Sequence, residues 1–290
     1  MADRTLPQLP VRAPDSHKGD FGRALLVGGS RGMTGAIALA GMAALRSGAG
    51  LVQLAVPNDC LEVVAGFEPS YMTAGLADDR AGRLSLAAQA NLADLANRAT
   101  AVACGPGLDR SDELTELVGW LYGTLKQPAV FDADALDALA QRPELLANHA
   151  GPRILTPHPG EFQRLIGSSA KFERRAGERE AQALAGRSSV VLVLKGHRTL
   201  ITDGTRQVHN TTGNPGMATG GSGDVLTGLL TALACQGLSP FDAAHLGVHV
   251  HGLAGDLAAA EMGQVSLIAG DLVRFLPAAF TKLGPPRTRP

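Results

Sequence analysis

The stretch VVLVL, at Val190–Leu194, decides the fold class because it is apolar at every position. A strand with one face in water alternates apolar and polar residues, whereas an unbroken Val/Leu run indicates a strand buried on both faces. Strands are predicted at 24–27, 51–56, 101–104, 129–132, 154–156, 190–195 and 199–202. Helices are predicted at about 34–48, 84–97, 111–124, 134–140, 160–167, 172–186, 224–236, 240–260 and 270–278. This alternation predicts a single-domain, doubly wound α/β fold with a mostly parallel sheet between helix layers.

Composition and charge narrow the function classes. The chain has 290 residues, of which 45% are hydrophobic, and a formal charge of −1 with scattered basic residues, so it carries no electrostatic footprint for nucleic acid or an anionic membrane. Three widely spaced cysteines fit neither a disulfide framework nor a zinc site. No signal peptide and no apolar run of roughly 20 residues is present. We therefore expect a soluble, cytoplasmic protein.

No linker interrupts the central part of the chain. Residues 17–280 are expected to form one domain. Residues 1–16 are polar and proline-rich and are predicted to be a loose arm, and residues 281–290 are predicted to be a disordered tail.

Polar and glycine-rich segments follow the predicted strands. They are GGSRGMTGA after the first strand, GPG at 105–107, DAD at 132–134, HPGE at 158–161 and KGHRT at 195–199. In doubly wound sheets, ligands bind outside the carboxyl ends of the strands. The sequence therefore predicts a site at that edge of the sheet.

A glycine loop leads into a predicted helix with an acid in its first turn. Five glycines lie within 213–223 and are followed by Asp224 and a helical pattern of leucines. Open backbone N–H groups at a helix N-terminus form an anion site, and glycine lets phosphate approach the backbone. Asp224, expected to stay ionised there, could take a proton from a substrate hydroxyl, as phosphoryl transfer requires. The alternative is a tight loop with Asp224 as a simple helix cap. Neither a P-loop nor a G-x-G-x-x-G fingerprint occurs.

Two further motifs favour ligand contacts. Pro159 suits the first position of a helix, which makes His158 its N-cap and places Glu161 in the first turn. Histidine is an unusual cap, so we predict that His158 contacts a ligand. Lys195 and Arg198 flank a glycine between two strands, which indicates phosphate recognition or, alternatively, a solvated hairpin end.

The backbone near two glycine-rich turns is a weaker candidate for contact with a ligand. Thr34 is predicted to cap a helix with a small inner face, so backbone near Gly35 and Ala36 either lines a cleft or serves packing alone. The GPG turn at 105–107 leaves backbone amides bare, although a turn needs no ligand.

Two patterns invite a metal interpretation and do not support it. Asp132 and Asp134 look like a metal pair, but Asp134 with Asp137 also fits a helix cap. His245 and His249, with His251 nearby, have zinc-protease spacing, but Leu246 stands where the general-base glutamate is required, so packing is favoured. No metal ligand from the protein is predicted.

Five motifs in order carry a family resemblance: HKGDFG at 17–22, GPG at 105–107, TPHPGEF at 156–162, VLKGHRT at 193–199 and NPGMATGGSGD at 214–224. Together they resemble the ADP/ATP-dependent NAD(P)H-hydrate dehydratases of the ribokinase-like superfamily, from His17 to about Leu276. One departure is Ser222, where threonine is usual in that family.

The resemblance implies a nicotinamide-repair enzyme that dehydrates the S form of NAD(P)HX to NAD(P)H. ADP, or ATP, would be the phosphoryl donor, with AMP and phosphate released when ADP is used and Mg²⁺ on the phosphates. It implies that Asp224 is the base. The implied anion hole is Gly220, Gly221, Ser222 and Gly223; the hydrate contacts are Ala36, Gly107, His158 and Asp224; the nucleotide contacts are Lys195, Gly196, His197, Arg198, Thr199 and Gly223.

The resemblance also implies partners and leaves alternatives open. A homotetramer is expected, together with a separate epimerase for the R form, since only about sixteen residues precede His17. One alternative is an ATP-dependent kinase of the same superfamily acting on a thiamine-precursor alcohol. Another is a non-catalytic nucleotide-binding regulator. The choices between ADP and ATP and between NADHX and NADPHX stay open.

Overall fold

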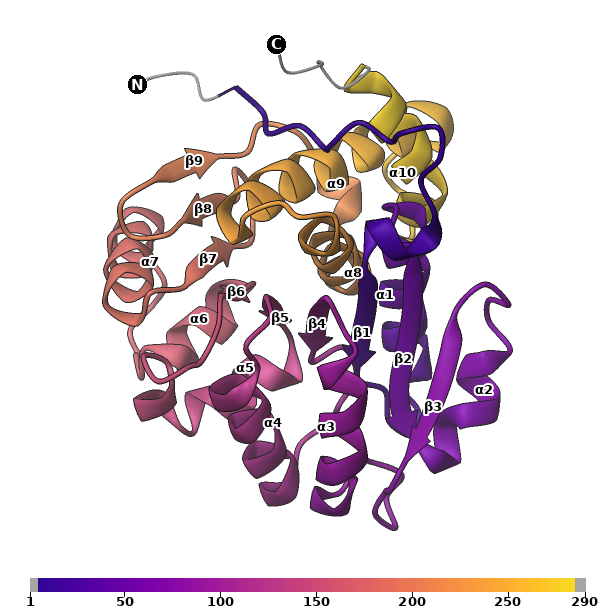
Figure 1. The fold of residues 1–290 in the computed structure, drawn as a ribbon. Coiled ribbons are helices and arrows are strands. Elements are labelled where there is room, and N and C mark those ends of the chain that lie inside the picture. The colour runs from indigo at the N-terminus through magenta and orange to yellow at the C-terminus, as the bar shows by residue number, and fades with distance from the viewer. Residues whose placement is uncertain (1–4, 285–290) are drawn as a thin grey trace.

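A nine-stranded sheet organises the molecule (Figure 1). The computed structural model describes residues 5–284. The strand order is β3-β2-β1-β4-β5-β6-β7-β8-β9; β1 to β7 are parallel, and β8 and β9 add antiparallel at one edge. The bounds are β1 (Arg23–Val27), β2 (Leu51–Pro57), β3 (Met72–Leu76), β4 (Ala101–Cys104), β5 (Ala129–Phe131), β6 (Arg153–Leu155), β7 (Val191–Leu194), β8 (Leu200–Thr202) and β9 (Gln207–His209).

Helices cover both faces of the sheet (Figure 1). Side chains alternate along β1, so Ala24 and Leu26 join one core while Leu25 and Val27 join the other. The first face packs against α1 (Thr34–Arg46), α2 (Leu61–Ala65), α8 (Ser222–Cys235), α9 (Pro240–Met262) and α10 (Ala269–Lys282). The second packs against α3 (Gln89–Asn97), α4 (Asp112–Thr124), α5 (Asp134–Ala140), α6 (Pro159–Leu165) and α7 (Arg174–Ser188). The predicted doubly wound sheet between helix layers is confirmed.

Helix α8 is enclosed by its neighbours and lies very close to α1. Every residue from Val225 to Cys235 is buried. A Cβ placed on Gly228 would lie 1.9 Å from the carbonyl oxygen of Ala40 in α1, so only glycine allows this approach. This close packing therefore holds the first turn of α8 in a fixed position.

The sequence prediction missed β3, β9 and α2. The segment MTAGL of β3 lacks an apolar run because β3 is an edge strand, and all but its last residue are at least partly exposed. Helix α2 has five residues and β9 has three, too few for a periodic pattern. The predicted cap at Thr34 is also wrong: Met33 is the N-cap, its side chain makes no capping bond, and Thr34 is the first helical residue.

The N-terminal arm is tethered more firmly than predicted. Residues 5–16 form no helix or strand, in keeping with an arm. However, the Arg12 guanidinium donates hydrogen bonds to the Gly48 carbonyl oxygen at 2.9 Å and to Gln236 Oε1 at 3.1 Å. It also lies 3.8 Å from the centroid of the Phe21 ring. These contacts fix the arm to the amino end of the sheet.

The predicted C-terminal boundary was placed too early. Helix α10 continues to Lys282, so the disordered tail expected from residue 281 does not begin there. Residues 285–290 lie outside the described part of the chain. Within residues 5–284, no helix is both long and apolar enough to cross a bilayer.

Candidate active site

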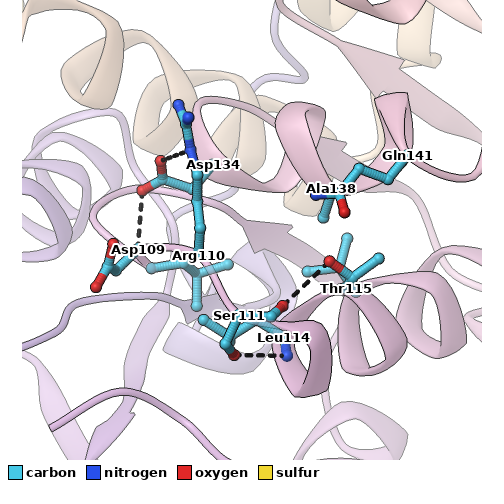
Figure 2. Close-up of a pocket in the computed structure, with 10 residues that line it drawn as sticks. Asp109, Arg110, Ser111, Leu114, Thr115, Asp134, Ala138 and Gln141 are labelled. Atoms are coloured by element: carbon cyan, nitrogen blue, oxygen red, sulfur yellow. Dashed lines mark hydrogen bonds and ion pairs between the residues drawn. The ribbon is translucent and has the colours of Figure 1, made fainter. Parts of the chain in front are cut away.

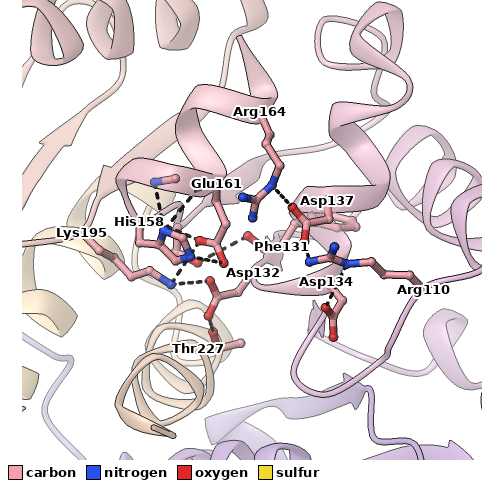
Figure 3. Close-up of polar contacts among 12 residues, drawn as sticks. Arg110, Phe131, Asp132, Asp134, Asp137, His158, Glu161, Arg164, Lys195 and Thr227 are labelled. Carbon is pink, nitrogen blue, oxygen red and sulfur yellow. Dashed lines mark hydrogen bonds and ion pairs between the residues drawn. The ribbon is translucent and has the colours of Figure 1, made fainter. Parts of the chain in front are cut away.

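A buried polar cluster joins the ends of β5, β6 and β7 to the first turns of α8 (Figure 3). Asp132 follows β5, and its Oδ1 lies 2.7 Å from the Lys195 ammonium, which follows β7. The Thr227 hydroxyl of α8 donates to Asp132 Oδ2 at 2.7 Å. Glu161 of α6 completes the cluster, with its Oε2 3.7 Å from Lys195 Nζ. The structure thus gathers a cation and two carboxylates at the predicted edge of the sheet.

The glycine loop forms an open entry to α8. Gly221 is the N-cap with φ 91°, a conformation that favours glycine. A Cβ on Gly220 would meet no atom within 4 Å, so the loop backbone there is accessible. The Ser222 hydroxyl donates to the Met217 carbonyl oxygen at 2.8 Å and so stabilises the loop. The first N–H groups of a helix have no partner within it, which makes this an anion-binding geometry.

Asp224 lies in the first turn of α8 beside the buried cluster. Burial and, to a smaller extent, the Asp132 carboxylate raise the pKa of Asp224 to about 7, against the opposing effect of the Lys195 ammonium. At neutral pH the group is therefore only partly ionised, whereas the sequence led us to expect full ionisation. A carboxyl group with this pKa is suited to both accepting and releasing a proton near pH 7.

The Lys195 ammonium keeps its charge inside the cluster. Burial disfavours the charge, but the carboxylates of Asp132 and Glu161 outweigh burial and raise the pKa of Lys195. A Cβ on Gly223 would lie 3.3 Å from Lys195 Nζ and 3.6 Å from Asp132 Oδ2. The positive charge is therefore held against the first turn of α8, directly beside Asp224.

His158 is the N-cap of α6, as predicted. Its Nδ1 accepts hydrogen bonds from the backbone N–H of Gly160 at 3.0 Å and of Glu161 at 3.3 Å, while Glu161 Oε2 accepts from the His158 N–H at 2.8 Å. Burial and the nearby Lys195 charge lower the pKa of His158, so the ring is neutral at pH 7. Its side chain is half exposed at the strand exits, where a ligand could contact it.

Two predicted hydrate-binding positions lie side by side. Gly107 has φ 66°, and a Cβ placed on it would lie 3.1 Å from the Ala36 Cβ and 2.6 Å from the Met33 carbonyl oxygen. A Cβ on Gly35 would meet nothing within 4 Å, so the first turn of α1 is open on that side. The end of β4 and the start of α1 therefore form one continuous backbone surface.

The segment 195–199 is divided between the interior and the surface. Lys195 joins the buried cluster, whereas Gly196, His197 and Arg198 are exposed in the turn between β7 and β8. Arg198 has φ 55°, and its carbonyl oxygen accepts a hydrogen bond from Arg174 at 2.7 Å. The Lys195 and Arg198 side chains, predicted together as a phosphate pair, thus have different environments.

Both aspartates of the DAD segment are engaged by partners within the protein. Both Asp132 oxygens are engaged by Lys195 and Thr227, and an Asp134 oxygen accepts the Asp109 N–H at 3.0 Å. Across residues 5–284, no group of three or more His, Cys, Asp or Glu side chains could hold a metal ion. A cavity beside Asp134, shown in Figure 2, has a volume of about 10 Å³, room for a single water molecule.

The sequence prediction missed several residues around the site. Thr227 was detectable as a polar residue on an otherwise apolar helix face, but its partner was not. The buried Asp137 carboxylate binds both Arg110 and Arg164 and ties α5 and α6 to the loop after β4 (Figure 3). His251 of α9, predicted as a packing residue, also holds the start of α8 through Nε2, 2.9 Å from the Ser222 carbonyl oxygen.

One of the five motifs lies away from the site. Residues 17–22 precede β1, at the opposite end of the sheet from the strand exits. Gly22 has φ 75°, and a Cβ on it would lie 2.6 Å from the Cys235 carbonyl oxygen, so this motif serves close packing.

Comparison with known proteins yields a consistent set of relatives. The family model described as NAD(P)H-hydrate dehydratase matches residues 24–278. The chain is 48% identical over 277 residues to the bifunctional NAD(P)H-hydrate repair enzyme Nnr of Moorella thermoacetica, covering 95% of this chain and 52% of that protein. The chain thus spans about half the length of that relative. It is 40% identical over 284 residues to the ADP-dependent (S)-NAD(P)H-hydrate dehydratase of Neisseria meningitidis, covering 94% and 90% of the two chains.

A solved structure supports the same grouping. The ADP/ATP-dependent NAD(P)H-hydrate dehydratase of Bacillus subtilis, co-crystallised with ATP and Mg²⁺, superposes with a TM-score of 0.80 at 31% identity and 94% coverage of each chain. The ribokinase-like fold predicted from the sequence is confirmed. With a family model that spans 24–278 and relatives at 40% identity or more along nearly the whole chain, this protein belongs to the NAD(P)H-hydrate dehydratase family.

Proposed function

We propose that this chain catalyses the ADP-dependent dehydration of the S form of NAD(P)HX to NAD(P)H, with release of AMP and phosphate. The observation that carries the proposal is Asp224: a partly buried carboxyl group with a pKa of about 7, in the first turn of a helix that a glycine loop opens, beside the Lys195 ammonium. A relative that is 40% identical over most of both chains bears the name of this activity.

The reaction proceeds in two stages. Asp224 takes the proton of the hydroxyl at C6 of the hydrated ring, and that oxygen forms a bond to the terminal phosphorus of ADP while the bond from phosphorus to the bridging oxygen breaks. AMP leaves. The lone pair of the ring nitrogen then expels phosphate from C6, and loss of a proton from C5 restores the dihydronicotinamide. A kinase-type site thus produces a net dehydration because its phosphoester is unstable.

The residues divide between two substrates. Backbone amides at Gly220, Gly221, Ser222 and Gly223 would stabilise the transferring phosphoryl group at the positive end of the α8 dipole. Ala36, Gly107 and His158 would contact the hydrate. The segment Lys195–Thr199, with Gly223, would contact the nucleotide. The adjacency of Ala36 and Gly107 and the position of Lys195 against Gly223 support this division.

Magnesium is proposed to enter on the nucleotide phosphates, which with water would supply most of its ligands. The described part of the chain offers no dedicated metal cage, since the Asp132 oxygens are already engaged. When bound, the ion would neutralise phosphate charge.

The assembly and the setting complete the proposal. We propose a homotetramer that acts in the cytoplasm, with an epimerase supplying the S form from the R form. The catalytic domain would run from His17 to the end of α10 at Lys282. Light scattering of the purified protein tests the tetramer.

The decisive assay mixes purified protein with NADHX or NADPHX, magnesium and either ADP or ATP. Recovery of absorbance near 340 nm together with stoichiometric phosphate establishes the dehydratase, and comparison of the nucleotides identifies the donor. A lasting phosphorylated product would instead identify a small-molecule kinase, such as one for a thiamine-precursor alcohol. Nucleotide binding without turnover of any hydrate would favour a regulator.

Replacing Asp224 by Asn separates a base from a helix cap. Loss of a positioned base lowers turnover by a factor of roughly a hundred or more, whereas nucleotide binding should persist. Asp271→Asn is the matched control, because Asp271 occupies the first turn of α10 and caps it through the Ile268 N–H at 3.0 Å. Equal turnover in both variants would contradict a catalytic role for Asp224.

A further inference from the structure

Asp132 has no role in the reaction as outlined, yet it is the most constrained residue of the cluster. Its side chain is 2% exposed, and both carboxylate oxygens have a charged or hydroxyl partner at 2.7 Å. These partners come from β7 and α8, two elements distant in the chain. Because both of its oxygens are engaged, the Asp132 carboxylate also fixes the positions of the Lys195 ammonium and the Thr227 hydroxyl.

The backbone at Asp132 is also unusual. The next residue, Ala133, has φ 49° and ψ −125°, which a side-chain-bearing residue rarely adopts. A Cβ on Gly105 would lie 1.8 Å from the Asp132 carbonyl oxygen, so the neighbouring strand exit packs directly on this turn. Strain of this kind persists where the surroundings overdetermine it, and it gathers at functional sites.

The partners of Asp132 lie around the catalytic turn. Thr227 is one helical turn beyond Asp224 on α8, and Lys195 Nζ lies against Gly223, the residue before it. We propose that Asp132 is a positioning residue, which fixes the Lys195 ammonium and the Thr227 hydroxyl around the Asp224 carboxyl group and its proton. The assignment of this proton to catalysis rests on the proposed dehydratase function.

The charges that face Asp224 explain how Asp132 acts. Its carboxylate, with those of Asp134 and Glu161, raises the pKa of Asp224, and the Lys195 ammonium lowers it. On α9, His251 contacts the Ser222 carbonyl oxygen but is neutral, since burial lowers its pKa to about 4. Asp132 therefore repels charge on Asp224 directly, while the Lys195 ammonium that Asp132 holds in place partly offsets this repulsion.

A direct titration of Asp224 tests this role without any turnover. Asp224 carboxyl signals, assigned by their loss in Asp224→Asn, are followed by carbon-13 NMR in the wild type and in Asp132→Asn. Removing the repulsion should lower the pKa of Asp224 by about one unit or more, the size of a close charge effect. Lys195→Gln should shift it upward. Asp134→Asn removes the same charge two residues away without touching Lys195, and should shift it less than Asp132→Asn does.

The pH profile of dehydration supplies the second readout. In Asp132→Asn the acidic limb of kcat/KM should move down by the same amount, and kcat at neutral pH should fall because Lys195 is no longer held in place. A purely structural Asp132 would lower the melting temperature and leave the limb unmoved. The inference is overturned if neither the acidic limb of kcat/KM nor the pKa of Asp224 changes in Asp132→Asn. It is also overturned if Asp134→Asn shifts the pKa of Asp224 as much as Asp132→Asn does.

The two hypotheses fail separately. If no hydrate is turned over but the Asp224 titration shifts with the stated signs, the dehydratase proposal is wrong and the positioning of Lys195 by Asp132 stands. If wild-type turnover is normal and the titration does not respond to Asp132, the dehydratase stands and the positioning role is wrong.

Discussion

Substituting Gly228 by Ala tests whether close contact between α1 and α8 supports the catalytic turn. The added Cβ would lie 1.9 Å from the Ala40 carbonyl oxygen, 2.7 Å from its carbon and 3.0 Å from its Cα. Real Cβ atoms essentially never approach closer than 3.0 Å. The two helices must therefore separate by roughly 1 Å, because the obstacle is backbone and cannot rotate away.

Two opposing terms set the magnitude. Alanine is favoured over glycine inside a helix by about 1 kcal/mol. Overpacking in a close-packed core costs about 1–3 kcal/mol, and a backbone obstacle places Gly228→Ala at the upper end. The net loss of unfolding free energy is about 2 kcal/mol, which lowers the melting temperature of a chain of this size by roughly 4–8 °C.

Thermal melting and urea unfolding measure the effect, with Gly270→Ala as the matched control. Gly270 is also helical, but it is exposed on α10, and its added Cβ would meet only the Ile268 side chain at 3.9 Å. The control should be as stable as the wild type or slightly more so. If Gly228→Ala melts together with Gly270→Ala, the close helix contact is not a constraint and the reasoning fails.

Below about pH 7, the kcat/KM for dehydration should fall with a slope that approaches tenfold for each pH unit, because Asp224 must be ionised to accept a proton. A pH profile measured with magnesium-saturated ADP that stays flat down to pH 5 would contradict this prediction. Burial lowers the pKa of His251 to about 4, below its unfolded value. Protonation of His251 therefore favours the unfolded chain as pH falls from about 6.5 to 4, by roughly 3 kcal/mol at most. Urea unfolding of the wild type and of His251→Gln measures this effect. The free energy of unfolding should fall less between pH 7 and pH 5 in His251→Gln than in the wild type. Arg153→Met should cost about 1–3 kcal/mol in thermal melts, since it leaves the buried Tyr122 and Leu125 carbonyl oxygens without their donor, while turnover per folded molecule is kept.

The elements predicted correctly are those with a strong local pattern. Most of the apolar run at 190–194 forms β7, which is buried along its whole length, and the loop at 213–223 became the entry to α8. The His158 cap was also found, because Pro159 and Glu161 mark a helix start within three residues. Strand β3 and helix α2 were missed because short, partly exposed segments show no recognisable periodicity of hydrophobic residues.

The sequence by itself determined the fold class, the order of the strand exits and the glycine loop with its acid. Each depends on residues that are neighbours in the chain, so periodicity, capping and glycine content report it. Only the tertiary structure decided that Lys195 meets Asp132 across 63 residues and that Thr227 meets it across 95. The pKa of Asp224, about 7, was likewise decided only by the tertiary structure. Its value is set by desolvation and by charges from separate strand exits, and these become neighbours only when the sheet and α8 assemble.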